Sequence, residues 1–384
     1  MAARVQDVVI VGAGPTGLAL AAELRRLGVN ALLFEKESYV ATTSRATVVH
    51  ARTLEVLEPL GVSQRLIDNG LILHKGNLRE GGEIKATISF DDLPTAYSFA
   101  LVCTQDRTES VLTQRLQELG GAVTRCIDVT SLAHTPESVT LTYTAAGVLV
   151  QDIAARWVVG CDGLHSNVRQ AAGIAFEGGE YEESFILADV EMDWPLGAEA
   201  MELFLHAAGL SLVVPLPGGR YRIIATLDNA PKHPTIADCQ RILDERTIPG
   251  AVVHTVHWSS RYRIQHRVAR KLRQGRILIA GDAAHVHSPA GGQGMNTGVQ
   301  DAVTLAAALH QAITTGDESG IAKWETERLK IARSVVNTTD MITKVATTSS
   351  PVLQTIREVV LGLVGHVPAL GHAVARRLSE IDNR

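Results

Sequence analysis

The chain has 384 residues, of which 46% are hydrophobic and 20% are charged, and its formal net charge is −5 at pH 7. This size and composition fit a globular protein with two closely joined domains or one large domain. The acidic balance offers no basic excess for a phosphate backbone, and no stretch approaches the roughly 20 apolar residues that span a bilayer, so we expect neither a nucleic-acid partner nor an integral membrane segment.

The sequence begins with a predicted β-α-β unit. Residues 7–11 form a short β-branched run, which is typical of a strand buried on both faces of a parallel sheet. Apolar residues recur at helical spacing from Leu18 to Leu27, and Gly28 stands where that helix is expected to end. A second strand is predicted over residues 31–34.

A glycine motif connects the first strand to the helix, and it reads Gly12-Ala13-Gly14-Pro15-Thr16-Gly17. In this context the three glycines permit, in order, a tight turn, the close approach of a pyrophosphate, and the packing of the helix on the strand. Glu35 ends the second strand, where a carboxylate can accept hydrogen bonds from an adenosine ribose. The motif predicts a dinucleotide site but does not say which dinucleotide binds.

The middle of the chain predicts a helix, several strands and tight turns. We expect a helix over residues 106–119, and a strand ending at Val159 leads into Gly160-Cys161-Asp162-Gly163. Between residues 186 and 227, three β-like runs and a turn at Pro217-Gly218-Gly219 predict an antiparallel sheet. The remaining predicted elements are strands at 139–143 and 276–280, a helix at 299–309, and a C-terminal helix at 352–364 packed on its own domain.

A glycine-rich loop follows the strand at 276–280. Asp282 lies at the carboxyl end of that strand, where open α/β sheets bind their ligands. Small residues between Gly281 and Gly298 let main-chain amides approach a planar ligand closely. The helix that begins near Asn296 offers its positive end to negative charge, such as that of a reduced flavin.

Metal ligands and disulfides are not indicated. His285 and His287 form an H-x-H pair, but only Asp282 accompanies them, so we expect no metal and a role for both histidines in hydrogen-bonding the loop. The four cysteines are widely spaced and form no C-x-x-C pair. This usage fits a reducing cytoplasm.

In order along the chain, these motifs resemble those of the FAD-dependent aromatic hydroxylases, the class A flavoprotein monooxygenases with the p-hydroxybenzoate hydroxylase fold. The sequence is similar to the phenol and polyketide hydroxylases, but it ends at Arg384 without their thioredoxin-like C-terminal domain, so we expect a compact member. The matching segments are Gly12 to Gly17 with Glu35, Ser44-Arg45-Ala46, His50 to Glu55, Gln105 with Arg107, Glu109 and Leu112, Cys161-Asp162-Gly163, Gly281-Asp282, and Pro289 to Asn296.

The resemblance implies where FAD binds. Glu35 would hold the adenosine ribose, Arg45 and Gln105 would lie along the ribityl and pyrophosphate side, and Asp282 would bond the ribityl or pyrophosphate region. Pro289, Gly292, Gly294 and Asn296 would form the catalytic loop at the flavin ring. The residues implied to contact the cofactor are Gly12, Gly14, Pro15, Thr16, Gly17, Glu35, Lys36, Arg45, Gln105, Asp162, Gly163, Gly281, Asp282, Gly291, Gly292, Gln293, Gly294, Met295 and Asn296.

The resemblance also implies the activity and the fold. It implies a monooxygenase that consumes NADPH or NADH and dioxygen and hydroxylates a phenolic or polycyclic aromatic substrate through a C4a-hydroperoxyflavin. The implied α/β fold interleaves a Rossmann-like FAD-binding domain with an antiparallel-sheet substrate domain, followed by C-terminal helices. We expect residues 1–70, 97–180 and 273–345 in the first domain, 71–96 and 181–272 in the second, and 346–384 in the helical segment.

Substrate contacts are expected from the antiparallel sheet and from the stretch 70–103. The apolar candidates for the wall of the site are Phe204, Leu212, Val214 and Pro215. The polar candidates are His74 and Tyr97, with His206 as a candidate for substrate hydrogen bonding or deprotonation.

Several alternatives remain open at this point. A plain NAD-dependent dehydrogenase explains the first motif but leaves the loop at 281–296 without a role. A flavoenzyme of the same fold could instead perform Baeyer–Villiger oxidation, N-oxygenation or reduction, and a non-catalytic flavin-binding protein would bind FAD without turnover. We expect a monomer or a homodimer.

Overall fold

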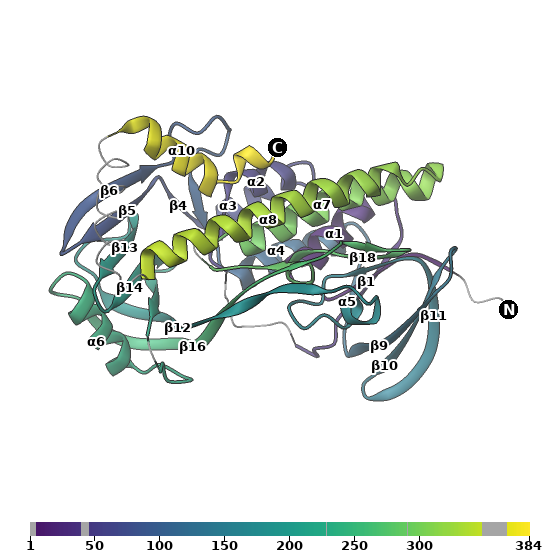
Figure 1. Cartoon of the computed structure of the whole chain (residues 1–384), viewed down its shortest axis with the longest axis horizontal. Coiled ribbons are helices and arrows are strands. Elements are labelled where there is room, and N and C mark those ends of the chain that lie inside the picture. Colours follow the sequence, from purple (N-terminus) through teal and green to yellow (C-terminus); the bar gives the residue numbers. More distant parts are fainter. Residues whose placement is uncertain (1–4, 40–45, 228, 290, 348–366) are drawn as a thin grey trace.

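The computed structural model describes residues 5–39, 46–227, 229–289, 291–347 and 367–384. Within these ranges the strands form three sheets. Two long helices, α7 (Gly294–Thr315) and α8 (Ser319–Thr347), lie side by side across the molecule (Figure 1). In the described part of the chain, no helix combines the length and apolar character needed to cross a membrane.

The first sheet contains the predicted β-α-β unit. Its central strand β1 (Gln6–Val11) pairs in parallel with β2 (Ala31–Phe34) on one side and with β11 (Val148–Gly160) on the other. Val8, Val9 and Ile10 are fully buried, so the prediction of a strand covered on both faces is confirmed. The other strands are β8 (Val123–Thr124), β9 (Ile127–His134), β10 (Val139–Ala145), β17 (Arg273–Gln274) and β18 (Ile277–Ile279).

Helices pack against this sheet. Helix α1 (Pro15–Arg26) contacts both α4 (Gln105–Glu118) and α7, and its leucines Leu18, Leu20 and Leu24 are buried. Burying such side chains is the main favourable contribution to folding, at about 1.5–3 kcal/mol for each. The short helix α5 (Asn167–Ala171) follows β11. This packing fixes the start of α1 at the carboxyl end of β1.

The second sheet is antiparallel except for one pair, which confirms the predicted sheet. β14 (Gly209–Leu216) and β15 (Arg220–Thr226) pair from Leu216 with Arg220 onward, so residues 217–219 form the predicted turn. Helix α6 (Ile236–Arg246) covers one face, as Figure 1 shows. The other strands are β12 (Phe176–Asp193), β13 (Ala200–His206), β16 (Val252–Ala269), β19 (His285–Val286), β5 (Lys75–Glu80) and β6 (Glu83–Ser89), with β13 and β5 parallel.

Some elements were not predicted from the sequence. Strand β16 has 18 residues and includes three arginines and three histidines, which obscure its alternation. Helix α8 has 29 residues, and polar side chains at Arg328, Thr339 and Thr343 interrupt its buried apolar face. The predicted helix at 352–364 lies outside the described residues. The remaining elements are α2 (Ala51–Leu57), α3 (Ser63–Asp68), α10 (Pro368–Leu378), the 3-10 turns η1 (Gly281–Ala283) and η2 (Ile381–Asn383), and a small sheet of β3 (Val48–Val49), β7 (Ala100–Val102) and β4 (Leu71–Leu73).

Candidate functional site

The glycine motif forms a tight turn between β1 and α1. Gly12 has a φ of +100°, and a Cβ there would lie 2.4 Å from the carbonyl oxygen of Cys161. A Cβ on Gly17 would lie 1.9 Å from the carbonyl oxygen of Gly12. Gly14 differs, because it has an ordinary extended conformation and a Cβ there would meet no atom of the described residues within 4 Å. Packing therefore requires the first and third glycines, whereas the second faces open space.

A cavity of about 260 Å³ opens in front of this turn. It brings together residues that the sequence analysis took from three separate segments. The predicted residues that line it are Gly12, Gly14, Glu35, Lys36, Asp162 and Gly163. Pro15 and Thr16 lie beside them in the first turn of α1.

The two carboxylates at this cavity hold its walls. Glu35 accepts hydrogen bonds from the backbone N–H of Ala13 (2.8 Å) and of Glu37 (2.9 Å). Asp162 accepts one from the Ser166 hydroxyl (2.5 Å) and one from the Val168 N–H (3.1 Å). Burial raises the pKa of Asp162, and the hydrogen bonds, which lower it, offset only part of this rise. The side chains thus fix the loops around the cavity before any ligand arrives.

Gln105 lies at the start of α4 and next to the segment that precedes β3. Its backbone N–H donates to the carbonyl of Ala46 (3.1 Å), and its Nε2 donates to Glu109 (2.8 Å). Burial raises the pKa of Glu109. Arg45, predicted to lie along the ribityl and pyrophosphate side of FAD, is outside the described residues.

The two glycine motifs pack on each other through Thr16. A Cβ on Gly281 or on Gly298 would lie 2.5 Å from the Thr16 hydroxyl oxygen. The first turn of α1 therefore enters a notch between η1 and α7. Asp282 lies in η1 and is exposed, just beyond the carboxyl end of β18.

The predicted flavin-ring loop leads into α7. Pro289 accepts a hydrogen bond from the Gly292 N–H (2.9 Å), which closes a turn. Pro289 and Gly291 are exposed, Gly292, Gly294 and Met295 are half-buried, and Gln293 and Asn296 are buried. The loop thus presents one open edge, while its other side is anchored in the protein.

Asn296 and His50 anchor this loop. Asn296 is fully buried; its Oδ1 accepts from the His50 N–H, and its Nδ2 donates to the carbonyls of Val48 and Gly292, all at 2.8 Å. His50 Nε2 lies 2.7 Å from the Gly291 carbonyl, and burial lowers the pKa of His50 to about 4. The ring is therefore neutral at pH 7, and Nε2–H donates to that carbonyl. The sequence did not predict this role, since a single histidine carries no signal of its own.

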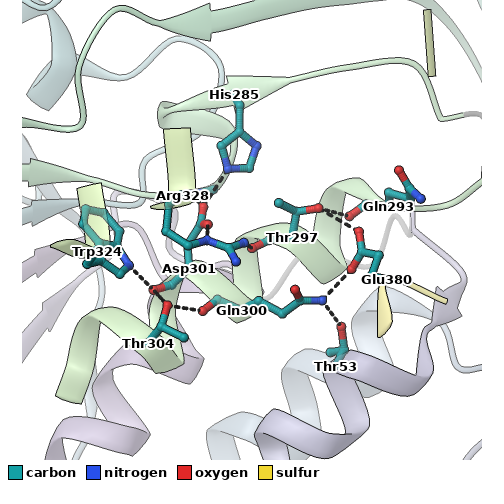
Figure 2. A network of polar contacts seen from close by, with 11 residues as sticks. Thr53, His285, Gln293, Thr297, Gln300, Asp301, Thr304, Trp324, Arg328 and Glu380 are labelled. Atoms are coloured by element: carbon teal, nitrogen blue, oxygen red, sulfur yellow. Dashed lines mark hydrogen bonds and ion pairs between the residues drawn. The ribbon is translucent and has the colours of Figure 1, made fainter. Parts of the chain in front are cut away.

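A buried polar network lies beneath the loop (Figure 2). The Asp301 carboxylate accepts hydrogen bonds from Arg328 Nε (2.5 Å), His285 Nε2 (2.6 Å) and the Gly281 N–H (3.1 Å). Burial opposes ionisation of Asp301, but Arg328 and His285 outweigh it and lower the pKa of Asp301 to about 2. An ionised Asp301 thus ties α7, α8 and the end of β18 together.

The two histidines of the H-x-H pair hold the surrounding structure. His285 contacts the Asp301 side chain, and His287 Nδ1 lies 2.8 Å from the Ser288 carbonyl. Burial lowers the pKa of His287 to about 4. Across the described ranges, no group of three or more His, Cys, Asp or Glu side chains is arranged to hold a metal ion.

The second sheet meets the segment before β3 through Arg222. This guanidinium is fully buried, with Nε and one terminal nitrogen donating to Asp189 (2.6 and 2.8 Å) and the other to the Thr47 hydroxyl (2.5 Å). Val214 pairs directly with Arg222 and shares its face of the sheet, as does Leu212. These two apolar candidates therefore lie on the side that meets residues 47–50.

Other predicted substrate residues lie elsewhere. Phe204 is on the opposite face, where it packs edge-on against Trp194 (6.0 Å between ring centres), and Pro215 alternates to that face as well. His206 lies at the exposed end of β13, where its Nδ1 accepts from the Ala208 N–H (3.1 Å). The structure thus separates these three residues from Leu212 and Val214, because neighbouring strand positions face opposite sides.

The candidates in the stretch 70–103 also make local contacts. His74 is exposed, with Nδ1 2.5 Å from an Asp91 carboxylate oxygen. Tyr97 packs edge-on against Phe99 (6.2 Å between ring centres), and burial raises the pKa of Tyr97. Neither is brought to the glycine-rich loop by these contacts.

Comparison with known proteins identifies the family of this chain. Residues 5–339 match the family model described as an FAD binding domain. A 6-methylpretetramide 4-monooxygenase from Streptomyces rimosus is 33% identical over 380 residues, which cover 97% of this chain and 68% of that protein. A pentachlorophenol 4-monooxygenase from Sphingobium chlorophenolicum is also 33% identical, covering 86% of this chain and 63% of that protein.

A solved structure shows the same fold over nearly its whole length. The p-nitrophenol 4-monooxygenase of Pseudomonas putida superimposes with a TM-score of 0.89 at 26% identity, covering 99% of this chain and 98% of that one. The Rossmann-like and antiparallel-sheet architecture predicted from the motifs is therefore confirmed. The chain belongs to the FAD-dependent aromatic hydroxylases and is an FAD-dependent monooxygenase.

Proposed function

We propose that FAD lies with its pyrophosphate over the turn at Gly12 to Gly14 and its flavin ring against the loop at 289–296. The open space at Gly14 supports this placement, because no atom of the described residues lies within 4 Å of where its Cβ would stand. The packing of Thr16 between Gly281 and Gly298 also supports it, because one elongated ligand can then contact both motifs. Arg45, Gln105, Asp282 and Met295 stay predictions of this proposal.

The protein's own contribution is to position the cofactor and to exclude water from it. Bound FAD supplies the hydride acceptor and the activation of dioxygen. Asn296 and a neutral His50 hold the loop so that its amides need no rearrangement when negative charge develops nearby. The start of α7 adds the positive end of its helix dipole.

We further propose that the enzyme hydroxylates a phenolic or polycyclic aromatic compound with NADPH or NADH and dioxygen. The observation that carries this is the apolar face of the second sheet at Leu212 and Val214, which packs with Leu73 and Val102 of the small sheet. On the same face, Arg222 donates to the Thr47 hydroxyl. The relatives named for 6-methylpretetramide and for pentachlorophenol fit the same class. A cytoplasmic location, a monomeric or dimeric state and the division into interleaved domains are parts of this proposal.

A substrate panel tests the reaction. Purified holoprotein should consume NADPH or NADH faster with one class among phenols, quinols and polycyclic aromatics, and mass spectrometry should find one added oxygen on a ring carbon. Insertion into a carbon–carbon bond or at nitrogen would favour Baeyer–Villiger oxidation or N-oxygenation. The hydroxylase proposal would be refuted if no aromatic compound stimulated the consumption of NADPH or NADH and no oxygenated product formed.

Two alanine variants test the cofactor placement. Gly14→Ala should weaken FAD binding about tenfold or more, because its methyl group enters the ligand's space. Gly76→Ala is the matched control, since its Cβ would approach protein atoms only at 3.9 Å. Equal FAD dissociation constants for both variants, measured by fluorescence titration, would contradict the placement.

A further inference from the structure

A carboxylate from the C-terminal segment reaches the first turns of α7. Glu380 follows α10 and is only 2% exposed. One of its oxygens lies 2.8 Å from the Thr297 hydroxyl, and the other accepts from Gln300 Nε2 at 2.5 Å (Figure 2). A residue more than eighty positions away in sequence thus contacts the helix that carries the proposed flavin loop.

Thr297 stands between this carboxylate and the loop. Its hydroxyl oxygen is also 3.0 Å from the carbonyl oxygen of Gln293. A hydroxyl has one proton, so Thr297 can donate to Glu380 or to Gln293 but not to both. When Glu380 is ionised, Thr297 must donate to it, because the carboxylate has no proton to give. When Glu380 is protonated, it can donate to Thr297, which then donates to Gln293.

The affected carbonyl belongs to the peptide that opens α7. The Gln293 carbonyl and the Gly294 N–H are two ends of one peptide group, and Gly294 is the first residue of the helix. A hydrogen bond accepted by the carbonyl polarises the group and makes its N–H a better donor. The Gln293 side chain also donates to the Arg377 carbonyl (3.3 Å), so the C-terminal segment contacts this residue directly as well.

Burial, and after it the nearby donors and charges, decide the pKa of Glu380. Burial raises the pKa of Glu380 to about 7, although the hydrogen bond from Thr297 and the charge of Arg328 favour ionisation. The Asp301 carboxylate adds to the rise. Other charged groups lie on the elements packed around Glu380. His285 pairs with Asp301, and Arg52 pairs with Glu55 on α2. The C-terminal segment carries Arg376, Arg377, Asp382 and Arg384.

We propose that Thr297 relays the protonation state of Glu380 to the Gln293–Gly294 peptide, which makes Glu380 a positioning residue for the flavin site. The inference rests on the proposed placement of the flavin ring. Protonation takes one proton from solvent and reverses one hydrogen bond, and no covalent bond changes in the protein. The protonated state offers a stronger amide donor and one less negative charge, so it favours an anionic flavin.

Three variants of the holoprotein test the relay. Glu380→Gln fixes a donor towards Thr297, Thr297→Val removes the hydroxyl at nearly equal size, and Thr297→Ser keeps it. Infrared absorption of the carboxyl group reports the proton on Glu380, and visible absorption reports the environment of bound FAD. In the wild type and in Thr297→Ser, both signals should change in one step with the same midpoint near pH 7.

The variants should separate the two signals. Glu380→Gln should lose both steps, whereas Thr297→Val should keep a carboxyl titration but lose the flavin step. A flavin step that persists unchanged in Thr297→Val, or the absence of a carboxyl titration between pH 5 and 9 in the wild type, would overturn the relay. Failure of the cofactor placement is seen separately, because it requires Gly14→Ala to leave FAD binding intact.

Discussion

Replacing Asn296 by alanine should release the glycine-rich loop from the protein. The change leaves three groups without their partner: the buried His50 N–H, the buried Val48 carbonyl and the half-buried Gly292 carbonyl, each now 2.8 Å from the amide. A buried group left unpaired costs about 1–3 kcal/mol. Because water can reach part of the space that is left, we expect the low end of this range for each group, and so a total loss of about 3 kcal/mol.

Urea unfolding of the FAD-free protein measures this loss directly. Asn69→Ala is the control, because Asn69 also donates to a carbonyl at 2.8 Å but lies on the surface, where a change within about 0.5 kcal/mol is expected. Asn296→Asp keeps the acceptor for His50 but loses both donated bonds, and it should also be destabilised. A loss below about 1 kcal/mol for Asn296→Ala would show that the loop is not held by these bonds.

Three further changes give distinct results. Asp301→Ala leaves the Arg328 charge buried without its partner and should cost about 3–5 kcal/mol in urea unfolding; a near-neutral effect would contradict the network. Gly17→Ala should prevent folding or FAD binding, because its Cβ would lie 1.9 Å from a carbonyl oxygen, and wild-type thermal stability would refute this. Glu380 has a pKa raised from 4.5 to about 7, so the wild type should lose up to about 3 kcal/mol of stability as pH rises through this interval. The Glu380→Gln variant should lack this loss when the free energy of unfolding is measured from pH 4 to 8. An equal dependence on pH in both proteins would refute this prediction.

The nucleotide half of the site could be predicted because its signals are local in sequence. The strand at 7–11, the glycine turn and Glu35 follow one another within a single β-α-β unit, and each has a backbone reason for its residue type. The same holds for the loop at 281–298, whose glycines permit the packing against Thr16. Patterns of this kind can be recognised in a single sequence without an alignment of homologues.

The contacts that hold the flavin loop could not be predicted, because they join distant segments. Asn296 contacts His50, which lies 246 positions away in the sequence, and Arg328 contacts Asp301, which lies 27 positions away on another helix. The substrate wall could be predicted only in part, for another reason. Alternation predicts that Phe204 and Val214 lie on defined faces of their strands, but it does not say which face α6 covers and which meets residues 47–50.

Two buried carboxylates near the start of α7 differ in pKa because only one of them contacts a cation directly. Asp301 and Glu380 are both fully enclosed, yet the pKa of Asp301 falls to about 2 and that of Glu380 rises to about 7. Arg328 donates its Nε–H to Asp301 and another N–H to the Thr297 carbonyl, so its charge is already engaged when Glu380 approaches. Glu380 receives neutral donors, Thr297 and Gln300, which do not offset burial. One carboxylate is thereby a permanent anchor, and the other is left as the group whose charge can follow the pH beside the loop.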